Sequence, residues 1–193
     1  GTLTEYVRMQ IDWCREKGVE IFSEGDTWPR PRFGSPASYL ECFDTILRAD
    51  GGTDGILKYV FDYVADDNYE KAYVDAAERN ESLYENIDRL FVGKTAVGVR
   101  PCNEPHIIRT AEYNCDEENL LNKIQDGVFS DEVRFATENS LPVSYDKGGI
   151  NIFFGENARH ISLEDLKYGN IIDIGAVKIL QERGVDVGIK IEK

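Results

Sequence analysis

The chain has 193 residues, 41% of them hydrophobic, which is enough for one full domain or two small ones with a buried core. Its formal net charge of -14 repels phosphate backbones and anionic lipids, so we expect neither nucleic acid nor a membrane surface as a partner. No apolar run approaches the roughly twenty residues that a membrane-spanning helix needs.

The first residue of the chain and its cysteines narrow the possible classes of protein further. The chain begins with Gly1 and its only methionine is Met9, so we expect it to be a segment of a longer protein. The four cysteines are scattered, at Cys14, Cys42, Cys102 and Cys115. They form no CxxC pair and no histidine is next to one, so we expect no metal site, and we interpret Cys14 and Cys42 as buried free thiols. Without a glycine-rich nucleotide motif we expect no cofactor. The cellular location stays open, with the cytoplasm as the default.

The first fifty residues predict two helices with a strand between them. A helix capped by Thr4 and ended by Gly18 precedes a short apolar strand at residues 19–22. Ser35 followed by proline predicts the start of the second helix, which Asp50-Gly51-Gly52 ends. Its expected buried stripe is formed by Leu40, Phe43 and Leu47.

The alternation continues up to Gly93. Residues 55–64 are rich in β-branched and aromatic side chains and predict a second strand, and residues 69–91 predict one long helix. The expected apolar side of that helix carries Tyr73, Ala77, Tyr84, Ile87 and Phe91. Alternating helices and strands favour a parallel sheet, but two strands do not make an independent one. We therefore expect residues 1–92 to be the closing part of a larger α/β domain.

The second half, residues 93–193, also alternates and is long enough to fold alone. Strand patterns occur at residues 94–99, 142–145, 150–154 and 185–191, and a Lys147-Gly-Gly turn separates the second from the third. Helix patterns occur at residues 116–125, after a capping box that begins at Ser162, and at residues 174–183. The predicted fold class of the whole chain is α/β.

Polar side chains gather in the loop that follows the first predicted strand. Two carboxylates, an indole and two guanidinium groups lie close together in the sequence, as Glu24, Asp26, Trp28, Arg30 and Arg32. Loops at the carboxyl ends of strands carry function in α/β proteins because they vary without disturbing the core. Carboxylates beside an aromatic platform suit sugar binding and glycosidic chemistry.

Glu24 is the main catalytic candidate in this loop. It would act as a nucleophile or a general base, with Asp26 or Asp62 setting the local charge. The alternative is that Glu24 pairs with Arg30 or Arg32 and only orders the loop. Retaining glycosidases need a second carboxyl group about 5 Å away, and nothing local identifies it.

The second predicted strand adds two more candidates. Period-two alternation places Lys58 and Asp62 on one face, where they would line a site or form a buried pair without catalytic meaning. Trp28 would stack on a sugar ring or simply anchor the loop. Residues 155–160 follow a strand and would present backbone amides to a ligand, but pairing of Glu156 with Arg159 is the default interpretation.

The order of these segments carries a resemblance. Residues 20–26 (Glu-Ile-Phe-Ser-Glu-Gly-Asp) and 54–63 (Asp-Gly-Ile-Leu-Lys-Tyr-Val-Phe-Asp-Tyr), then a helix and a new α/β unit, resemble a large bacterial glycoside hydrolase. The chain looks like the last two βα units of a (β/α)8 barrel of the β-galactosidase-like clan. The flavodoxin-like, amidotransferase-like domain of that architecture would follow, and the resemblance covers the whole chain.

The resemblance implies specific roles. In that clan the nucleophile is a glutamate at the end of the seventh barrel strand, a position that Glu24 would match. The acid/base residue comes from the fourth strand, which this chain does not contain. The resemblance therefore implies that this chain is a fragment that is inactive alone. The implied partners are a carbohydrate ligand and the rest of the parent polypeptide.

The resemblance also bears on the second half of the chain. The clan's second domain lacks amidotransferase chemistry, which agrees with the absence of a Cys-His-Glu arrangement near Cys102 or Cys115. That domain often supports assembly, so the resemblance leaves homo-oligomerisation open. A rival hypothesis is a non-catalytic ligand-binding or assembly module whose acidic loop is structural.

Overall fold

A computed structural model describes residues 2–24, 36–57, 71–107, 119–122, 131–147 and 149–189, and the account below concerns these residues. The chain divides into two compact units, each described here by itself. The N-terminal unit consists of Gln10–Lys94, and the C-terminal unit combines Gly1–Met9 with Thr95–Lys193. The predicted boundary at Gly93 lies next to the division after Lys94, but the first nine residues pack with the second half of the chain.

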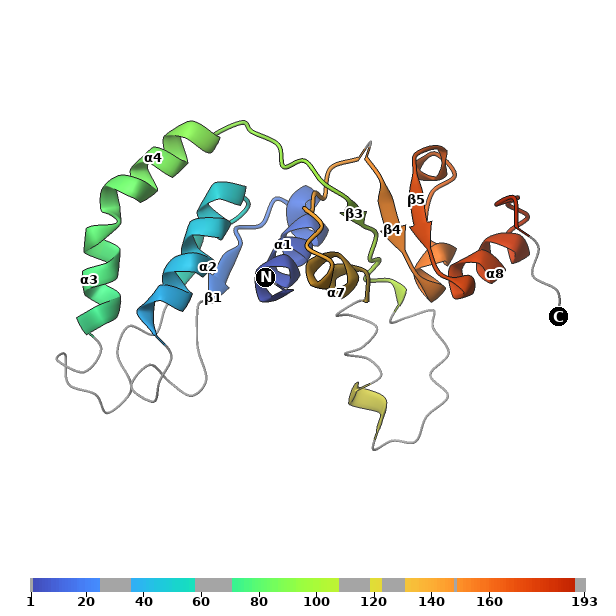
Figure 1. Ribbon diagram of the computed structural model, residues 1–193, viewed down its shortest axis with the longest axis horizontal. Helices are drawn as coiled ribbons and strands as arrows, with labels where there is room; N and C mark the ends of the chain where they lie inside the picture. The colour runs from blue at the N-terminus through green and yellow to red at the C-terminus, as the bar shows by residue number, and fades with distance from the viewer. Residues whose placement is uncertain are drawn as a thin grey trace. The chain divides into compact units, whose positions relative to one another are not determined.

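Helix α1 spans Thr2–Cys14 and contributes to both units (Figure 1). Thr4 lies inside this helix and is buried, so the prediction that it caps the helix was wrong. The helix continues into a 3-10 turn at Arg15–Lys17 and ends at Gly18, whose φ of 65° is a left-handed conformation that glycine adopts without strain. The predicted stop is confirmed.

The sheet of the N-terminal unit is a parallel pair. Strand β1 spans Phe22–Glu24 and β2 spans Gly55–Leu57, with Phe22 opposite Gly55 and Glu24 opposite Leu57. The first strand therefore begins three residues later than predicted, and Glu24 is its last residue rather than part of the following loop. Residues 58–64 of the second predicted strand lie outside the described residues.

Helix α2, Ala37–Asp50, confirms the predicted apolar stripe. Its buried residues are Leu40, Phe43, Asp44 and Leu47, which recur at helical spacing. Pro36 occupies the N-cap position, and Gly51 ends the helix with a φ of 71° while its backbone N–H bonds the carbonyl of Leu47. The predicted stop is confirmed, but the helix begins one residue later than the Ser35-Pro36 pattern predicts, and Ser35 lies outside the described residues.

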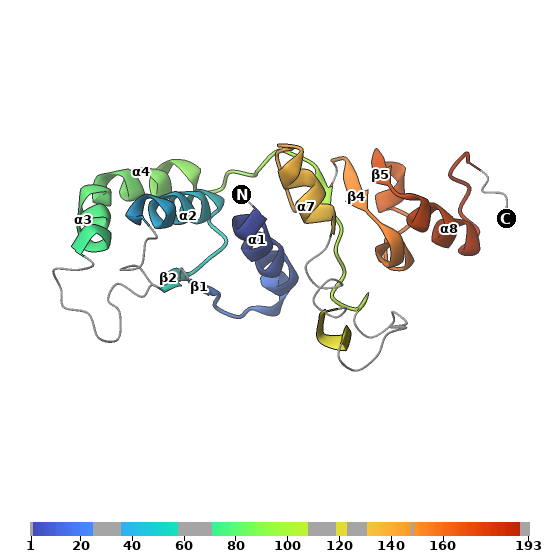
Figure 2. The same ribbon diagram turned by 60° about the horizontal axis from the view of Figure 1, so that its bottom comes forward.

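The predicted long helix at residues 69–91 is two helices. Helix α3 spans Lys71–Arg79 and α4 spans Glu81–Phe91, and Asn80 interrupts them with a φ of -96° and a ψ of 4°. Both helices lie alongside α2 (Figures 1 and 2). Ala76 and Ile87 are buried, but Ala77 and Phe91 are exposed, so the predicted buried face was wrong in part.

The sheet of the C-terminal unit has three parallel strands in the order β3-β4-β5. Their bounds are Arg100–Pro101, Asn151–Phe153 and Asn170–Ile172. A parallel bridge between Val99 and Val143 extends the pairing on the free side of β3. The predicted strand at residues 94–99 was wrong, because residues 94–97 are exposed and without strand structure and pairing begins only at Val99.

Helices α7 (Asp131–Glu138) and α8 (Ile174–Glu182) belong to this unit, together with the 3-10 turns η3 (Gly155–Arg159) and η4 (Asp165–Lys167). The helix pattern at 116–125 is described only at residues 119–122, which are helical. The core packs α8 against η3 and the end of the sheet. Its buried members are Cys102, Phe153, Ala158, Ile161, Ala176, Ile179 and Leu180.

Two predictions at the end of the chain differ in outcome. The predicted capping box is confirmed in part, because Ser162 Oγ accepts a hydrogen bond from the Asp165 N–H at 3.0 Å, but the helix expected after it is only a short 3-10 turn. The last predicted strand was wrong over its described part. Residues 185–189 are not a strand, and Val185 and Val187 pack against the core instead.

Candidate functional site

Glu24 ends β1 on the open face of the parallel pair. Phe22 and Glu24 are exposed whereas Ser23 between them is buried, as strand alternation requires. On β2, Ile56 borders a hollow together with Arg48 of α2 and Ile87 of α4, so the helices cover the Ile56 side of the pair. Glu24 therefore lies on the same face of the pair as Phe22 and Leu57, and these helices do not cover that face. Leu57 is 57% exposed.

The remaining predicted site residues cannot be compared with Glu24. Asp26, Trp28, Arg30 and Arg32, which follow β1, lie outside the described residues, as do Lys58 and Asp62, which follow β2. Their roles stay predictions. What the register does fix is that Glu24 and Leu57 lie opposite each other at the carboxyl ends of two parallel strands.

Helix α2 carries the acidic residues Glu41 and Asp44 one turn apart, and Asp44 is buried with 3% exposure. Glu41 accepts hydrogen bonds from Arg79 at 2.5 Å and from Asn80 at 2.7 Å, which ties α2 to the junction between α3 and α4. Glu41 therefore links α2 to α3 and to Asn80.

A second set of polar residues follows the strands of the C-terminal unit. Glu132 of α7 is 1% exposed, and its Oε1 accepts hydrogen bonds from the Phe154 N–H at 2.7 Å and from Asn157 Nδ2 at 2.8 Å. The Asn157 Oδ1 in turn accepts from the Glu104 N–H at 3.0 Å. The sequence analysis missed Glu132, because a buried carboxylate on an amphipathic helix has no distinguishing sequence pattern.

Residues 155–160 use their polar groups within the protein. The Gly155 N–H donates to Asp173 Oδ1 at 2.9 Å, and the same oxygen accepts from the Ala176 N–H at 2.7 Å, capping α8. Glu156 and Arg159 form an ion pair at 2.6 Å, which confirms the structural interpretation of that pair. The loop therefore stabilises the fold with the amide groups that could have bound a ligand.

The thiols differ from one another. Cys102 follows β3 in the core, and burial raises its pKa to about 12, so it is a thiol rather than a thiolate at neutral pH. Cys14 is half-buried and Cys42 is exposed, so the prediction that both are buried was wrong. Cys115 lies outside the described residues.

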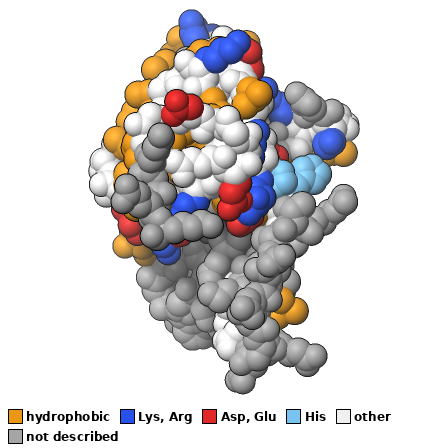
Figure 3. All heavy atoms as spheres, turned by 90° about the vertical axis from the view of Figure 1, so that its right-hand side faces the viewer, with side chains coloured by type: hydrophobic (Ala, Val, Ile, Leu, Met, Phe, Trp, Pro, Cys, Tyr) orange, Lys and Arg blue, Asp and Glu red, His pale blue; other side chains and the backbone are white. Residues whose placement is uncertain are grey.

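The two histidines come together from different loops. His106 and His160 have ring centroids 6.5 Å apart, and Figure 3 shows histidine atoms, in pale blue, at the surface. Within the described ranges, no group of three or more histidine, cysteine, aspartate or glutamate side chains could hold a metal ion. The described helices are also all too short or too polar to cross a membrane.

The described part of the chain is thus a mixed α/β protein with small parallel sheets. Comparison with protein-family models, with curated proteins and with solved structures found no match to this chain.

Proposed function

We propose that this chain is part of a carbohydrate-active enzyme of the glycoside hydrolase type, with Glu24 as the carboxylate that faces the sugar. The observation that carries the proposal is the position of Glu24, at the carboxyl end of β1 and on the face that α2 and α4 leave open. In barrel-type α/β enzymes, catalytic groups lie at the carboxyl ends of the strands.

The proposed chemistry needs two carboxyl groups. A retaining enzyme holds them about 5–5.5 Å apart, whereas an inverting enzyme leaves about 6.5–9.5 Å for a water molecule. Glu24 would attack the anomeric carbon or stabilise its positive charge, and Asp62, on the segment after β2, would lie at the same edge. A proton donor for the leaving oxygen would come from the parent polypeptide, so we expect binding but no turnover from the isolated chain.

The test is calorimetric titration with methyl β-galactoside and methyl β-glucoside, followed by a cationic iminosugar of matching configuration. An iminosugar imitates the charge that develops at the anomeric carbon, so its affinity depends on a nearby carboxylate. Glu24→Gln should weaken iminosugar binding about tenfold or more while leaving the neutral glycosides less affected. Glu20→Gln, an exposed glutamate just before β1, is the matched control and should bind like the wild type. Equal iminosugar affinity for the wild type and Glu24→Gln would remove the basis of the proposal.

We also propose that the C-terminal unit is a flavodoxin-like domain that supports assembly rather than chemistry. The Val143 segment, β3, β4 and β5 lie side by side in the chain order 2-1-3-4, which is the beginning of the flavodoxin-like strand order. Glu132, Asn157 and Asp173 all bond within the protein where such folds bind ligands. Light scattering during gel filtration tests the assembly role, and a monomer at all concentrations would contradict it.

A further inference from the structure

Two hollows in the N-terminal unit share the side chain of Arg48. They have volumes of about 550 and 580 Å³, and Ile56 and Asp88 also line both of them. The first hollow continues to Lys94 at the end of α4, whereas the second is bordered by the carboxylates Glu78, Glu81 and Glu85. Volumes of this size accommodate small organic molecules.

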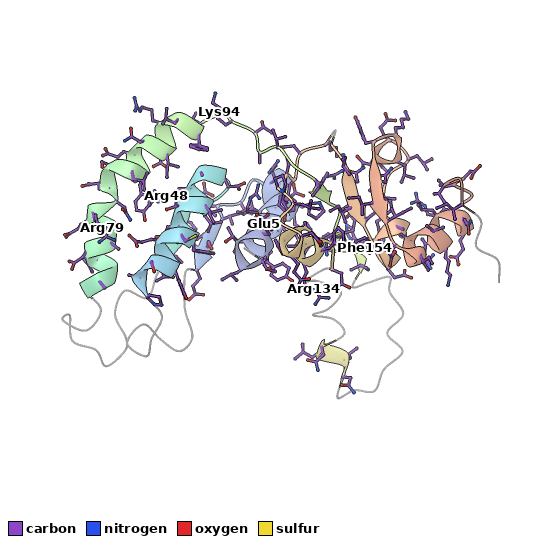
Figure 4. All side chains as sticks on the ribbon, viewed as in Figure 1. Glu5, Arg48, Arg79, Lys94, Arg134 and Phe154 are labelled. Atoms are coloured by element: carbon purple, nitrogen blue, oxygen red, sulfur yellow. The ribbon has the colours of Figure 1, made fainter. Side chains whose placement is uncertain are left out.

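Arg48 is held in place by contacts other than hydrogen bonds to the described residues. Its guanidinium carbon lies 4.5 Å from the centroid of the Tyr84 ring, a cation–π contact that orients the planar group. Its Nη1 is 3.6 Å from Asp88 Oδ2, which is an ion pair beyond hydrogen-bond distance. Its Nε is buried and has no hydrogen-bond partner within the described part of the chain. Figure 4 shows Arg48 extending from α2 on the side of α3 and α4.

Other arginines of the chain, unlike Arg48, donate hydrogen bonds to carboxylates. Arg79 donates to Glu41 at 2.5 Å, and Arg159 donates to Glu156 at 2.6 Å. A guanidinium group presents five N–H donors in a planar fork that matches a carboxylate. Arg48 therefore combines a fixed orientation, a buried Nε without a hydrogen-bond partner among the described residues, and an adjoining hollow.

We propose that the first hollow binds a small organic carboxylate with an apolar body, with Arg48 holding the carboxylate. Ile56, Ile87 and Phe91 supply the apolar lining. Three carboxylates, Asp50, Asp54 and Asp88, line the first hollow together with Arg48 and Lys94. A phosphate dianion is disfavoured because these carboxylates repel a doubly charged anion more strongly than a monocarboxylate. This site is separate from the Glu24 edge, because it borders Gly55 and Ile56 at the start of β2.

The experiment is a titration of the whole ¹⁵N-labelled chain, monitored by NMR, with phenylacetate as the probe. Phenylacetate should produce saturable shifts at the amides of Thr53, Ile87 and Val92, which line the first hollow. Phenylacetamide, the uncharged analogue, should bind at least about tenfold more weakly, since it cannot form charge-assisted hydrogen bonds. Inorganic phosphate should also bind more weakly. Absence of saturable shifts with phenylacetate, or equal binding of the acid and the amide, would overturn the proposal.

Variants locate the interaction. Arg48→Gln should weaken phenylacetate binding about tenfold or more, while Arg79→Gln, which changes an arginine that lines neither hollow, should leave it unchanged. Asp88→Asn removes the competing carboxylate and should strengthen binding several-fold. If Arg48→Gln fails to fold, the binding of phenylacetate by Asp88→Asn tests the role of Arg48 instead. Binding that is unchanged or weakened in Asp88→Asn would refute that role.

Discussion

The two parallel sheets of this protein differ in how completely they are covered. In β4, all three residues from Asn151 to Phe153 are at 0% exposure, because β3 and β5 flank this strand and helices and turns pack around it. In the β1–β2 pair, Phe22 is 51% exposed and Leu57 is 57% exposed. Parallel strands are normally buried on both faces. The same alternation of helices and strands thus gives a closed core in one unit, whereas in the other the described helices cover only the Ile56 side of the sheet.

The polar groups at the carboxyl ends of the strands also differ between the two units. In the C-terminal unit the polar groups beyond the strands bond to one another, as Glu132 does with the Phe154 N–H and with Asn157. In the N-terminal unit the carboxylate at the end of β1 stays exposed. The first arrangement stabilises a fold, and the second leaves a side chain available for a ligand.

The largest expected effect on stability comes from comparing one phenylalanine in each sheet, Phe153 in β4 and Phe22 in β1. Phe153→Ala removes a fully buried ring from β4 and should cost about 3–5 kcal/mol of unfolding free energy. Phe22→Ala changes a half-exposed ring on β1 and should cost less than about 1 kcal/mol. Hydrogen exchange followed by mass spectrometry measures both losses in the peptides that contain each strand. Similar losses at the two positions would contradict the open face of β1–β2.

Removing the buried carboxylate of α7 should have the next largest effect. Glu132→Ala leaves the Phe154 N–H and the Asn157 amide without their acceptor and should cost about 2–4 kcal/mol. Glu138→Ala, at the exposed end of the same helix, is the control and should change stability by less than about 0.5 kcal/mol. Urea denaturation of the three proteins compares them. A loss below about 1 kcal/mol for Glu132→Ala would show that the network is dispensable.

The cap of α8 should have a smaller effect. Asp173→Ala removes the acceptor for the Ala176 and Gly155 N–H groups and should cost about 1 kcal/mol. Asp173→Asn keeps a side-chain oxygen and should recover most of this stability. Thermal unfolding distinguishes the variants. An Asn variant as unstable as the Ala variant would mean that capping is not the role of Asp173.

The smallest expected effects concern the thiols. Alkylation at pH 8 should modify the exposed Cys42 well before the buried Cys102, as peptide mapping would detect. Burial raises the pKa of Cys102 from 9.0 to about 12, so at intermediate pH the unfolded chain loses a proton that the folded chain keeps. Its contribution to stability is therefore complete below about pH 9 and is lost as the pH rises to about 12. Equal alkylation rates for the two thiols would contradict the burial of Cys102.

How far the sequence could predict the structure depended on the range of the interactions. The stripe of α2 and the stops at Gly18 and Gly51 depend on neighbouring residues, and they were predicted correctly. Strand β3 has only two residues and exists through its pairing with β4, so the apolar run before it was misleading. The interruption at Asn80 was missed because no glycine or proline marks it.

The candidate sites follow the same division. Glu24 could be proposed from the sequence because a carboxylate after an apolar run at a strand end is a local signal. Glu132 was missed because its partners, Phe154 and Asn157, are 22 and 25 residues away. Arg48 was missed because its contact with Tyr84 and its unused Nε arise only where α2 and α4 meet.

The sequence by itself determined the α/β class, the net negative charge and the helix ends at Gly18, Gly51 and Gly184, because composition, periodicity and capping act over a few residues. Only the tertiary structure decided which strands pair and which carboxylates are buried. It also decided that one sheet is covered while the face bearing Glu24 is open. Those outcomes depend on contacts between residues far apart in the chain, whose burial no local pattern specifies.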